Sequence, residues 1–327
     1  MAHITILGSL NYDLVTTAER VPLGGETVPA SGFATHNGGK GANQALASQR
    51  LSGADVTVRM VGRVGQDEFG KILKGGLERE GVDVSFVETV PGESGVAVII
   101  VEQSTGENRI LVNAGANGTF SAADVSLDMF RTPTGLTDVL VLQNELPLAA
   151  VFRAIEIAHE NGIKIVYNPS PMYSAEVAAA GVLSKVDYLV VNETELGSVL
   201  ADAPALDAED VFGSAIAIAQ QAFAEFQFDG AQTIVVTLGS HGAFYVDAAT
   251  ADVRANVVPS FKPPRVVDTT GAGDSFLGAF VGAVATGVST QDALRRGAAA
   301  GAIAVSRAGA AEGVPFLDEA LALVEGA

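Results

Sequence analysis

The sequence predicts an α/β fold whose largely parallel β-sheet is covered by helices on both faces. Three observations predict it. Short runs of β-branched residues alternate with amphipathic helical stretches, polar residues directly follow several of these runs, and two regions, 25–36 and 94–114, hold consecutive extended segments with no helix between them. The alternation is typical of parallel strands joined by helices, and the helix-free regions predict a small antiparallel sheet that stands off the main one.

Each element follows from its local pattern. Six β-branched runs predict strands of the main sheet, which start at Ile4, Val56, Val139, Lys164, Tyr188 and Thr233. Four amphipathic stretches predict helices over residues 41–51, 67–80, 148–162 and 208–226. The run 276–284 is apolar on every face and predicts a buried helix, and the alanine-rich run 294–305 predicts another packed helix. Because no repeat, biased tract or linker interrupts the pattern, we expect a single domain over residues 1–327.

Composition excludes several classes of function. The chain has 327 residues and a formal net charge of -19, which argues against a nucleic-acid or anionic-membrane surface because both need a basic patch. A local phosphate site remains possible, since backbone amides can supply it. The absence of cysteine excludes disulfides, thiolate catalysis and cysteine-ligated metals, and it fits a reducing cytosol.

Three further absences support a soluble cytoplasmic protein. The four histidines show no spacing typical of metal ligands. The chain starts with a strand-like run rather than a basic segment and an apolar core, so we expect no signal peptide. No uninterrupted apolar run approaches the ~20 residues of a membrane span.

Polar residues gather where the predicted strands end. Ligands of open α/β sheets bind beyond the carboxyl ends of the strands. Any single polar residue there could be only a loop cap or an Asx turn, but their convergence on one edge favours a site. These residues are Asn11, Asp13, Glu145, Asn168, Asn192, Glu195, Thr237, Gly239 and Asp268.

The stretch VVDTTGAGDSFLGAF places a carboxylate in the first turn of the predicted buried helix. Free backbone N–H groups and the helix dipole make such a turn an anion site, which a phosphate can approach closely at Gly271 and Gly273. Asp274 would then face a transferring phosphoryl group, where a carboxylate is suited to removing a proton from the attacking hydroxyl. Alternatively, Asp274 is only an acidic first-turn residue, with Thr269 or Thr270 as the helix cap.

The common nucleotide motifs are absent. The stretch HNGGKGAN resembles a Walker A loop, but Ala34 stands in place of its first glycine and Gly41 in place of its magnesium-binding Ser or Thr. The first strand leads into LGSLNYD rather than G-x-G-x-x-G, so a dinucleotide-binding fold has no support.

Two glycine signatures remain, GGKGANQA from Gly38 and DTTGAGDSF from Asp268, and with them the chain resembles the ribokinase family of PfkB-type sugar and nucleoside kinases. The resemblance runs from Gly8 to about Pro315. It implies a three-layer ribokinase-like fold with a small β-sheet lid formed by residues of about 14–37 and 94–114. It also implies that Asp274 is the catalytic base and that an anion hole is built by Gly271, Ala272 and Gly273.

The resemblance assigns binding roles to the polar strand ends. Residues implied to hold the sugar are Asn11, Asp13, Gly39, Lys40, Gly41, Asn43, Glu145 and Asp274. Amides and carboxylates suit sugar hydroxyls, and Gly39 and Lys40 are expected to contact the sugar through their backbone, although Lys40 could also be an ordinary solvated lysine. Residues implied to bind ATP are Asn192, Thr237, Leu238, Gly239, Ser240, Gly242 and Gly273.

Two metal ions and a homodimer are implied as well. Glu195 is expected to organise magnesium through water, since magnesium keeps much of its hydration when it binds to proteins. A potassium ion is implied beside the anion hole, held largely by carbonyl oxygens around Asp268, Thr270, Ala304, Arg307 and Gly309. The family pairs its lids into a homodimer, which would also cover the exposed edge of a small sheet.

Three positions depart from the family pattern. Gly297 stands where a side chain near the adenine is common, Gly313 where a cation-site side chain is often polar, and Asn37 where an apolar residue is usual. Gly297 leaves the contact with the adenine base without support, and Gly313 removes one expected ligand of the monovalent cation. Asn37 points to an altered sugar preference.

The resulting hypothesis is ATP-dependent phosphorylation of D-ribose at O5 to ribose 5-phosphate. Other kinases of the family act on deoxyribose, fructose, a keto-deoxy sugar acid or a nucleoside, and these stay open as alternatives. A phosphorylated sugar is disfavoured because the implied contacts are Asn, Asp and Glu rather than basic residues. From another class, the chain could be a sugar-binding regulator without catalysis, against which Asp274, Asn192 and Glu195 argue.

Overall fold

The computed structural model describes residues 1–172, 177, 181–200, 203–226, 232–248 and 256–326. Its main sheet has nine strands in the order β15-β14-β13-β12-β11-β10-β1-β4-β5 within these ranges. The bounds are β1 Ala2–Leu7, β4 Val56–Gly65, β5 Asp83–Val90, β10 Val139–Leu142, β11 Lys164–Tyr167, β12 Tyr188–Asn192, β13 Thr233–Thr237, β14 Gly242–Asp247 and β15 Val258–Pro259. Strands β13 through β5 are parallel, and β14 and β15 are antiparallel to their neighbours, which confirms the predicted largely parallel sheet.

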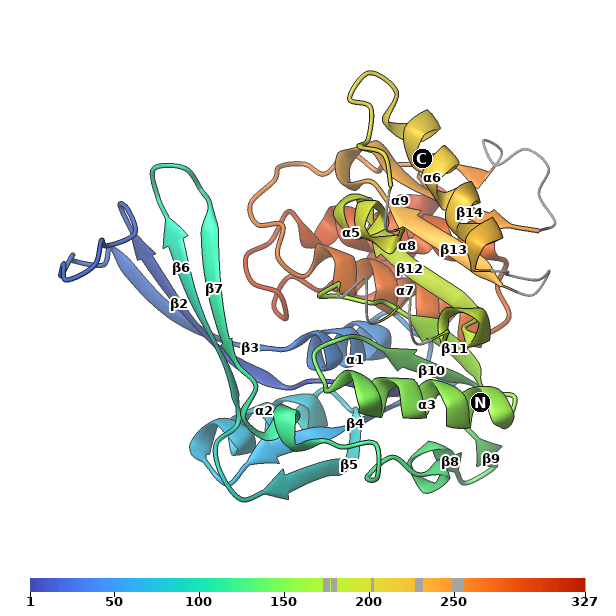
Figure 1. The fold of residues 1–327 in the computed structure, drawn as a ribbon, viewed down its shortest axis with the longest axis horizontal. Helices are drawn as coiled ribbons and strands as arrows, with labels where there is room; N and C mark the ends of the chain where they lie inside the picture. Colours follow the sequence, from blue (N-terminus) through green and yellow to red (C-terminus); the bar gives the residue numbers. More distant parts are fainter. Residues whose placement is uncertain (173–176, 178–180, 201–202, 227–231, 249–255, 327) are drawn as a thin grey trace.

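Helices cover both faces of this sheet (Figure 1). They are α1 Lys40–Arg50, α2 Glu68–Arg79, α3 Leu148–Glu160, α5 Glu193–Val199, α6 Val211–Glu225, α7 Ala272–Ala285, α8 Thr290–Ala304 and α9 Leu317–Glu325. Short 3-10 turns are η1 Gly115–Thr119, η2 Leu127–Phe130, η3 Leu183–Lys185 and η4 Gly239–His241. A two-stranded ribbon, β8 Arg131–Thr132 with β9 Gly135–Leu136, lies apart from the main sheet.

Two hydrophobic clusters show the three layers. Along β10, Leu140 and Leu142 pack with α3, α5 and α6, whereas Val139 and Val141 pack with α1, α7 and α8. Successive strand residues point to opposite faces, so one four-residue strand contributes to both clusters. Helix α7 is buried over residues 275–284, which confirms the prediction from its uniformly apolar sequence.

A second, four-stranded sheet projects from the body of the molecule (Figure 1). Its order is β3-β2-β6-β7, with β2 Asn11–Ala18, β3 Gly32–Gly38, β6 Gly95–Glu102 and β7 Asn108–Asn113. The prediction of an antiparallel sheet is wrong in one respect, because β2 and β6 pair in parallel. Both strands leave the main sheet after parallel strands, β1 and β5, and therefore enter the small sheet in the same direction.

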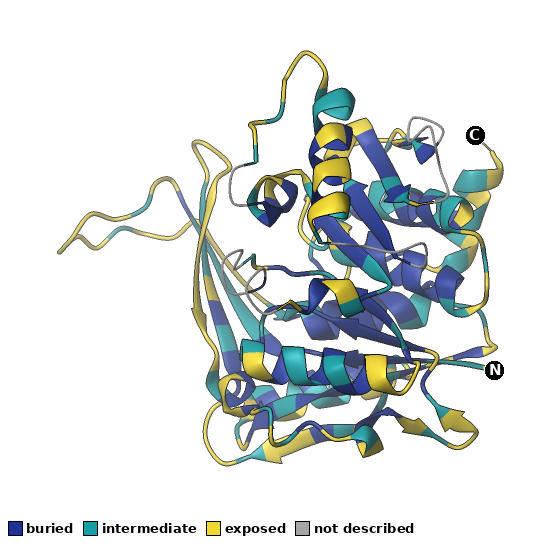
Figure 2. Cartoon of the chain, turned by 45° about the vertical axis from the view of Figure 1, so that its right-hand side comes forward, coloured by how far each residue is buried: buried dark blue, intermediate teal, exposed yellow. Residues whose placement is uncertain are grey.

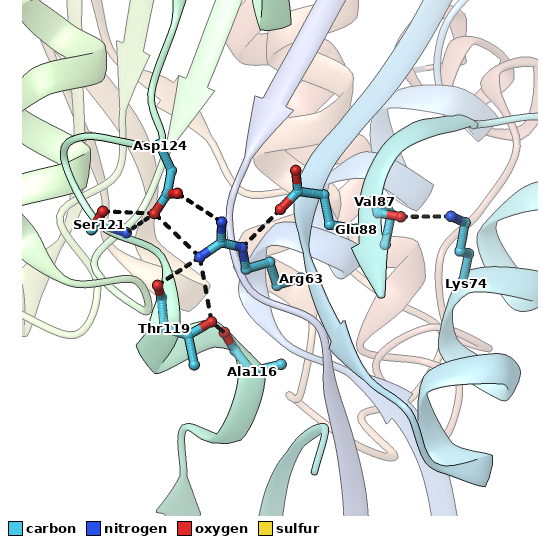
Figure 3. A network of polar contacts seen from close by, with 8 residues as sticks. All are labelled: Arg63, Lys74, Val87, Glu88, Ala116, Thr119, Ser121 and Asp124. Carbon is cyan, nitrogen blue, oxygen red and sulfur yellow. Dashed lines mark hydrogen bonds and ion pairs between the residues drawn. The ribbon is translucent and has the colours of Figure 1, made fainter. Parts of the chain in front are cut away.

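Arg63 on β4 ties the chain that returns from the small sheet to the main body (Figure 3). Its guanidinium pairs with Glu88 at 3.0 Å and with Asp124 at 2.9 Å, and it donates to the carbonyl oxygen of Thr119 at 2.6 Å. It also lies over the Phe120 ring, 4.8 Å from the ring centroid. A hydrogen bond from Ser121 and the Arg63 guanidinium hold the pKa of Asp124 well below its usual range.

We expect Arg63→Met to lower the free energy of unfolding by about 1–3 kcal/mol, because it removes the donor shared by Glu88, Asp124 and the Thr119 carbonyl group and leaves Asp124 only its hydrogen bonds from Ser121. A carboxylate whose pKa is lowered by folding stabilises the fold at pH values above its pKa in the unfolded chain, and this stabilisation is lost as the pH falls. The difference between variant and wild type should therefore be largest near neutral pH and shrink in acid. Urea unfolding at several pH values measures it. Arg131→Met, which breaks only the exposed pair with Asp128, is the matched control and should change little.

Candidate active site

The carboxyl ends of the parallel strands meet the first turns of two helices. Loops after β1, β10 and β11 lie on this edge of the main sheet, as do the starts of α1 and α7. Asn43 and Gln44 of α1 contact Asp274 of α7, although about 230 residues separate them in sequence. The edge therefore collects polar groups from distant segments, as expected for a ligand site of an open α/β sheet.

Glu145 is the centre of one polar cluster. Its Oε2 accepts hydrogen bonds from the Ser9 hydroxyl at 2.5 Å, from the backbone N–H of Lys40 at 2.9 Å and from the Asn11 amide at 3.5 Å. Asn117 in η1 donates to Asn11 Oδ1 at 2.8 Å and so determines how the Asn11 amide is turned. The first turn of α1 and the loop after β1 are thus held on the same carboxylate.

Two glycines of the GGKGAN signature allow this close approach. Gly39 has φ +87, and a Cβ at this position would lie 2.7 Å from the backbone nitrogen of Asn11. A Cβ at Gly41 would lie 2.6 Å from the carbonyl carbon of Gly8. Any side chain at either position would push α1 away from the β1 loop.

Asp13 projects from β2 toward the same space. It is the cross-strand neighbour of His36, and a Cβ at Gly38 would lie 2.2 Å from its Oδ2. Burial and the charge of Glu145 raise the pKa of Asp13 to about 7, and His36 opposes this shift. Asp13 is therefore a carboxyl group whose charge changes near neutral pH.

Asp274 lies in the first turn of α7, as the sequence predicts. The N-cap is Gly271 at φ +76 with no side-chain cap, so the prediction that Thr269 or Thr270 caps this helix is wrong. The Asp274 carboxylate accepts from Asn43 Nδ2 at 3.3 Å and from Gln44 Nε2 at 3.0 Å. The backbone of Gly273 and Asp274 belongs to the first turn, where N–H groups have no intrahelical partner and can bind an anion.

Lys40 is not a solvated lysine. It is half-buried at the start of α1 and faces Asp274, Glu145 and Glu195. Burial lowers the pKa of its ammonium group, but these three carboxylates offset that effect and the pKa is raised overall. The ammonium group is thus the positive charge that three site carboxylates share.

Sequence reasoning missed several residues of this site. Ser9 and Asn117 orient Glu145 and Asn11, and Gln44 contacts Asp274 directly. The signal for Gln44 was present in GGKGANQA, because residues four apart on a helix share a face and Lys40 and Gln44 both belong to α1. Asn117 had no signal in the sequence, since its contacts depend on the return of the small sheet.

The predicted nucleotide residues lie on the neighbouring strands. Asn192 and Thr237 are register partners at the ends of β12 and β13. Asn192 and Glu195 form a capping box at the start of α5, with bonds of 2.8 and 3.0 Å. In the loop after β13, Leu238 is buried in the core, so only its backbone can contact a ligand. The other predicted nucleotide residues of this loop are Gly239, Ser240 and Gly242.

Glycine is required at one end of that loop. Gly242 has φ +115, and a Cβ there would lie 2.2 Å from the carbonyl oxygen of Val258. Within the described ranges, no hydrogen bond joins this loop to the cluster around Glu145. One connection between the two halves is the electrostatic contact of Lys40 with Glu195.

Asp268 joins the loop before α7 to the loop after α8. Its Oδ1 accepts from the backbone N–H of Thr270 at 2.9 Å and its Oδ2 from that of Gly309 at 3.0 Å. Burial raises the pKa of Asp268, but these backbone donors lower it overall. The Arg307 side chain pairs with Glu319 instead, so Arg307 can contribute only its backbone to this cluster. Ala304 can likewise contribute only its backbone.

The structure shows what surrounds each of the three departures from the family pattern. A Cβ at Gly313 would lie 2.6 Å from the carbonyl oxygen of Gly309, so a polar side chain does not fit there. Gly297 packs against the Phe276 ring, where a Cβ would lie 2.9 Å from ring carbons. Asn37 lies against Gly76 of α2 and lines a cavity of about 200 Å³ that also touches Arg79 and Asn43. Because Asn37 alternates with His36 and Gly38 on β3, it points to the face opposite Asp13.

Oxygen donors suited to hard cations are present at two places. Glu195 is a buried carboxylate, and the carbonyl oxygens of Ala304 and Gly309 both lie close to Gly313, near the loops joined by Asp268. Among the residues that the structure describes, no group of three or more His, Cys, Asp or Glu could hold a metal by itself. A magnesium ion here would therefore need water or phosphate oxygens as further ligands, which is its usual mode.

None of the helices in the described ranges is both long and apolar enough to cross a membrane.

Comparison with known proteins finds relatives that match nearly the whole chain. Residues 1–317 match the model of the pfkB family carbohydrate kinases. A ribokinase of Schizosaccharomyces pombe is 42% identical over 326 residues, which cover 98% of this chain and 96% of that protein.

Solved structures give the same result. A ribokinase of Cryptococcus neoformans in complex with ADP superposes with a TM-score of 0.85 at 32% identity, covering 100% of this chain and 99% of the other. An Arabidopsis thaliana ribokinase complexed with ribose and ATP superposes with a TM-score of 0.82 at 29% identity, covering 99% of each chain.

Proposed function

This chain belongs to the pfkB family of carbohydrate kinases, and we propose from that premise that it catalyses ATP-dependent phosphorylation of D-ribose at O5 to ribose 5-phosphate. The observation that carries the proposal is the contact of Asp274, in the first turn of a buried helix, with α1, whose first turn is also bound to Glu145. A general base, an anion-binding turn and acceptors for hydroxyl groups thereby meet at one sheet edge. Residues 1–327 act as one kinase domain.

Asp274 accepts the proton of the 5-hydroxyl while O5 attacks the γ-phosphorus of ATP. The bond from that phosphorus to the bridging oxygen of ADP breaks, and the proton later passes from Asp274 to solvent. Backbone amides of the turn Gly271, Ala272 and Gly273 stabilise the negative charge on the transferred group. Support comes from the position of this turn at the start of α7 and from the positive φ of Gly271.

The sugar is held by the cluster around Glu145. Its hydroxyls donate to the carboxylates of Asp13 and Glu145 and bond with the amides of Asn11 and Asn43, while the remaining contacts come from the backbone of Gly39, Lys40 and Gly41. Sugar hydroxyl groups then replace the hydrogen bonds that these buried polar groups would otherwise make with water. Among the described residues of this cluster there is no arginine, and Lys40 faces three carboxylates, so no guanidinium fork is available for a phosphate already on the sugar.

ATP lies across Asn192 and the loop that contains Thr237, Leu238, Gly239, Ser240 and Gly242, with its γ-phosphate toward Gly273. Magnesium, when bound, neutralises charge on the phosphates. Glu195 would organise it through water, which fits a single buried carboxylate whose Oε2 is already used by the backbone of Asn192.

A potassium ion would be held by oxygens of Asp268, Thr270, Ala304, Arg307 and Gly309. The cradle formed by the Ala304 and Gly309 carbonyls beside Gly313, which a Cβ would obstruct, supports this site. The ion would stiffen the neighbouring turn before α7. Initial rates in potassium, sodium and large organic cation buffers test it, and equal rates would remove the potassium assignment.

The small sheet acts as a lid and as a dimer interface. Phe33, Ile110, Leu111 and Val112 are 52–70% exposed on its strands, and Figure 2 shows the projecting sheet with much of its surface exposed. Leu111 and Phe33 lie on one face of this sheet and Ile110 and Val112 on the other, because successive strand residues alternate. These exposed apolar side chains and the free edge of β7 favour pairing with a second copy in solution. The cysteine-free chain favours the cytoplasm. Sedimentation of the wild type as a dimer and of Leu111→Lys as a monomer is the test.

A substrate panel tests the function. With ATP and magnesium, we expect kcat/KM to be highest for ribose among ribose, 2-deoxyribose, fructose, a keto-deoxy sugar acid and adenosine. A sugar lacking one bound hydroxyl leaves a buried polar group unpaired, which costs about 1–3 kcal/mol, or about tenfold to a hundredfold. A preference for another member would keep the kinase and change its substrate, and no turnover on any member would indicate a sugar-binding regulator.

We expect the affinity for ribose to fall as the pH drops below about 7, the pKa of Asp13. Sugar hydroxyl groups donate to the ionised carboxylate of Asp13, so ribose binds the deprotonated form. Below pH 7 the free protein carries a proton on Asp13, and the free-energy cost of removing this proton opposes binding. The dissociation constant should rise toward about tenfold per pH unit. Calorimetric titration without ATP between about pH 5.5 and 8.5 measures it. Asp13→Asn should bind more weakly with a flat profile, and an equally steep profile in this variant would contradict the role of Asp13.

A further inference from the structure

Gln44 lies against the carboxylate that the proposed function uses as base. Its side-chain Nε2 donates to Asp274 Oδ1 at 3.0 Å and reaches Asn168 Oδ1 at 3.3 Å, while its Oε1 accepts from Gln143 Nε2 at 2.6 Å. Gln44 is 1% exposed and Gln143 is fully buried. We propose that Gln44 is a positioning residue, which holds Asp274 in the orientation needed for proton abstraction.

The neighbours of Gln44 determine which way its amide faces. Asn168 uses its own Nδ2 to donate to the carbonyl oxygen of Val190 at 2.9 Å, so its oxygen is turned toward Gln44. Gln143 supplies the donor on the other side. A reversed Gln44 amide would place its oxygen against both the Asp274 carboxylate and Asn168 Oδ1. The arrangement is therefore a directed chain of amides, from Gln143 through Gln44 to Asp274.

Three elements fix this chain in place. Gln44 belongs to α1, and Gln143 and Asn168 directly follow β10 and β11. Asp274 thus rests on side chains anchored to the main sheet rather than on a mobile surface contact. A group supported in this way is held close to one geometry, as a catalytic constellation requires.

The two carboxylate oxygens of Asp274 are held differently. Gln44 binds Oδ1 and Asn43 binds Oδ2 at the longer distance of 3.3 Å. With Oδ1 held by a buried amide, rotation about the Cβ–Cγ bond is restricted and Oδ2 stays directed toward the hydroxyl. The ammonium group of Lys40 also faces this carboxylate.

The inference rests on the proposed function and is tested on the full-length protein with Gln44→Met, which keeps the length of the side chain and removes its donor. We expect kcat with ribose to fall about tenfold to a hundredfold, since a slightly misaligned base is costly, while KM for ribose changes less than about threefold. Gln143→Met, which removes only the support of Gln44, should lower kcat in the same direction by less. Gln49→Met is the matched control, because Gln49 lies on the same helix with an unpaired buried amide oxygen and should leave kcat unchanged.

The pH profile of kcat separates positioning from a general loss of structure. Gln44→Glu places a second carboxyl group beside Asp274, so the acid limb of the profile should move to higher pH by about one unit or more, as for two carboxylates that share a proton. A smaller fraction of folded enzyme would lower kcat without moving that limb. Wild-type kcat and profile in Gln44→Met, Gln143→Met and Gln44→Glu would overturn the positioning role. A wild-type protein inactive on every sugar would instead overturn the proposed function.

Discussion

Replacing Asp274 with asparagine is expected to lower turnover by about 10²–10⁴-fold, because the amide keeps the shape of the side chain but cannot accept the hydroxyl proton. The fold should persist, since an asparagine at this position could keep one of the two contacts that Asn43 and Gln44 make with Asp274. Initial rates at saturating ribose and ATP measure the loss, and thermal unfolding checks that the variant is folded.

The alternative role of Asp274, an acidic residue that only stabilises a helix start, has its own control. Asp292 is the third residue of α8, as Asp274 is of α7, and there it bonds with the Ser289 cap. If interaction with the helix dipole were the whole role of Asp274, Asp292→Asn and Asp274→Asn would both change stability slightly and leave kcat unchanged. A near-wild-type kcat in Asp274→Asn would return that residue to this structural role.

Lys40→Met is expected to lower kcat/KM by about 10²–10³-fold, the range found when one preorganised electrostatic group is removed from an active site. The substitution removes the positive charge that Asp274, Glu145 and Glu195 each face. Without it these side chains lose an electrostatic partner, and their movement would disturb the base or the sugar contacts. The measurement is steady-state kinetics with ribose and with ATP as the varied substrate.

Lys71→Met is the control for Lys40→Met. Lys71 is an exposed lysine on α2 whose pair with Glu68 is solvent-accessible on both sides, so its loss should leave kcat/KM within about twofold. If Lys40→Met behaved like Lys71→Met, the ammonium group would have no part in the reaction and Lys40 would contribute only its backbone N–H to Glu145.

Local pattern was sufficient for most of the fold. The periods of two and of 3.6 residues are properties of short segments, so β1, β4, β10 to β13 and the helices α1, α2, α3 and α6 were predicted within a few residues of their bounds. β5, β14 and β15 were missed. The DTTGAGD and GGKGAN signatures are local as well, since each glycine and the first-turn Asp274 belong to one loop and the helix it starts.

Tertiary structure alone decided how these segments meet. The parallel pairing of β2 with β6, the burial of Lys40 among three carboxylates, and the contact of Gln44 with Asp274 all join residues that are tens to hundreds of positions apart. No local period encodes such contacts, because they depend on the order of strands in the sheet and on where each chain segment leaves it. The sequence by itself therefore predicted most of the element types, a candidate anion-binding turn and a candidate base, whereas close packing of distant elements determined which amide contacts that carboxylate and which ammonium group faces it.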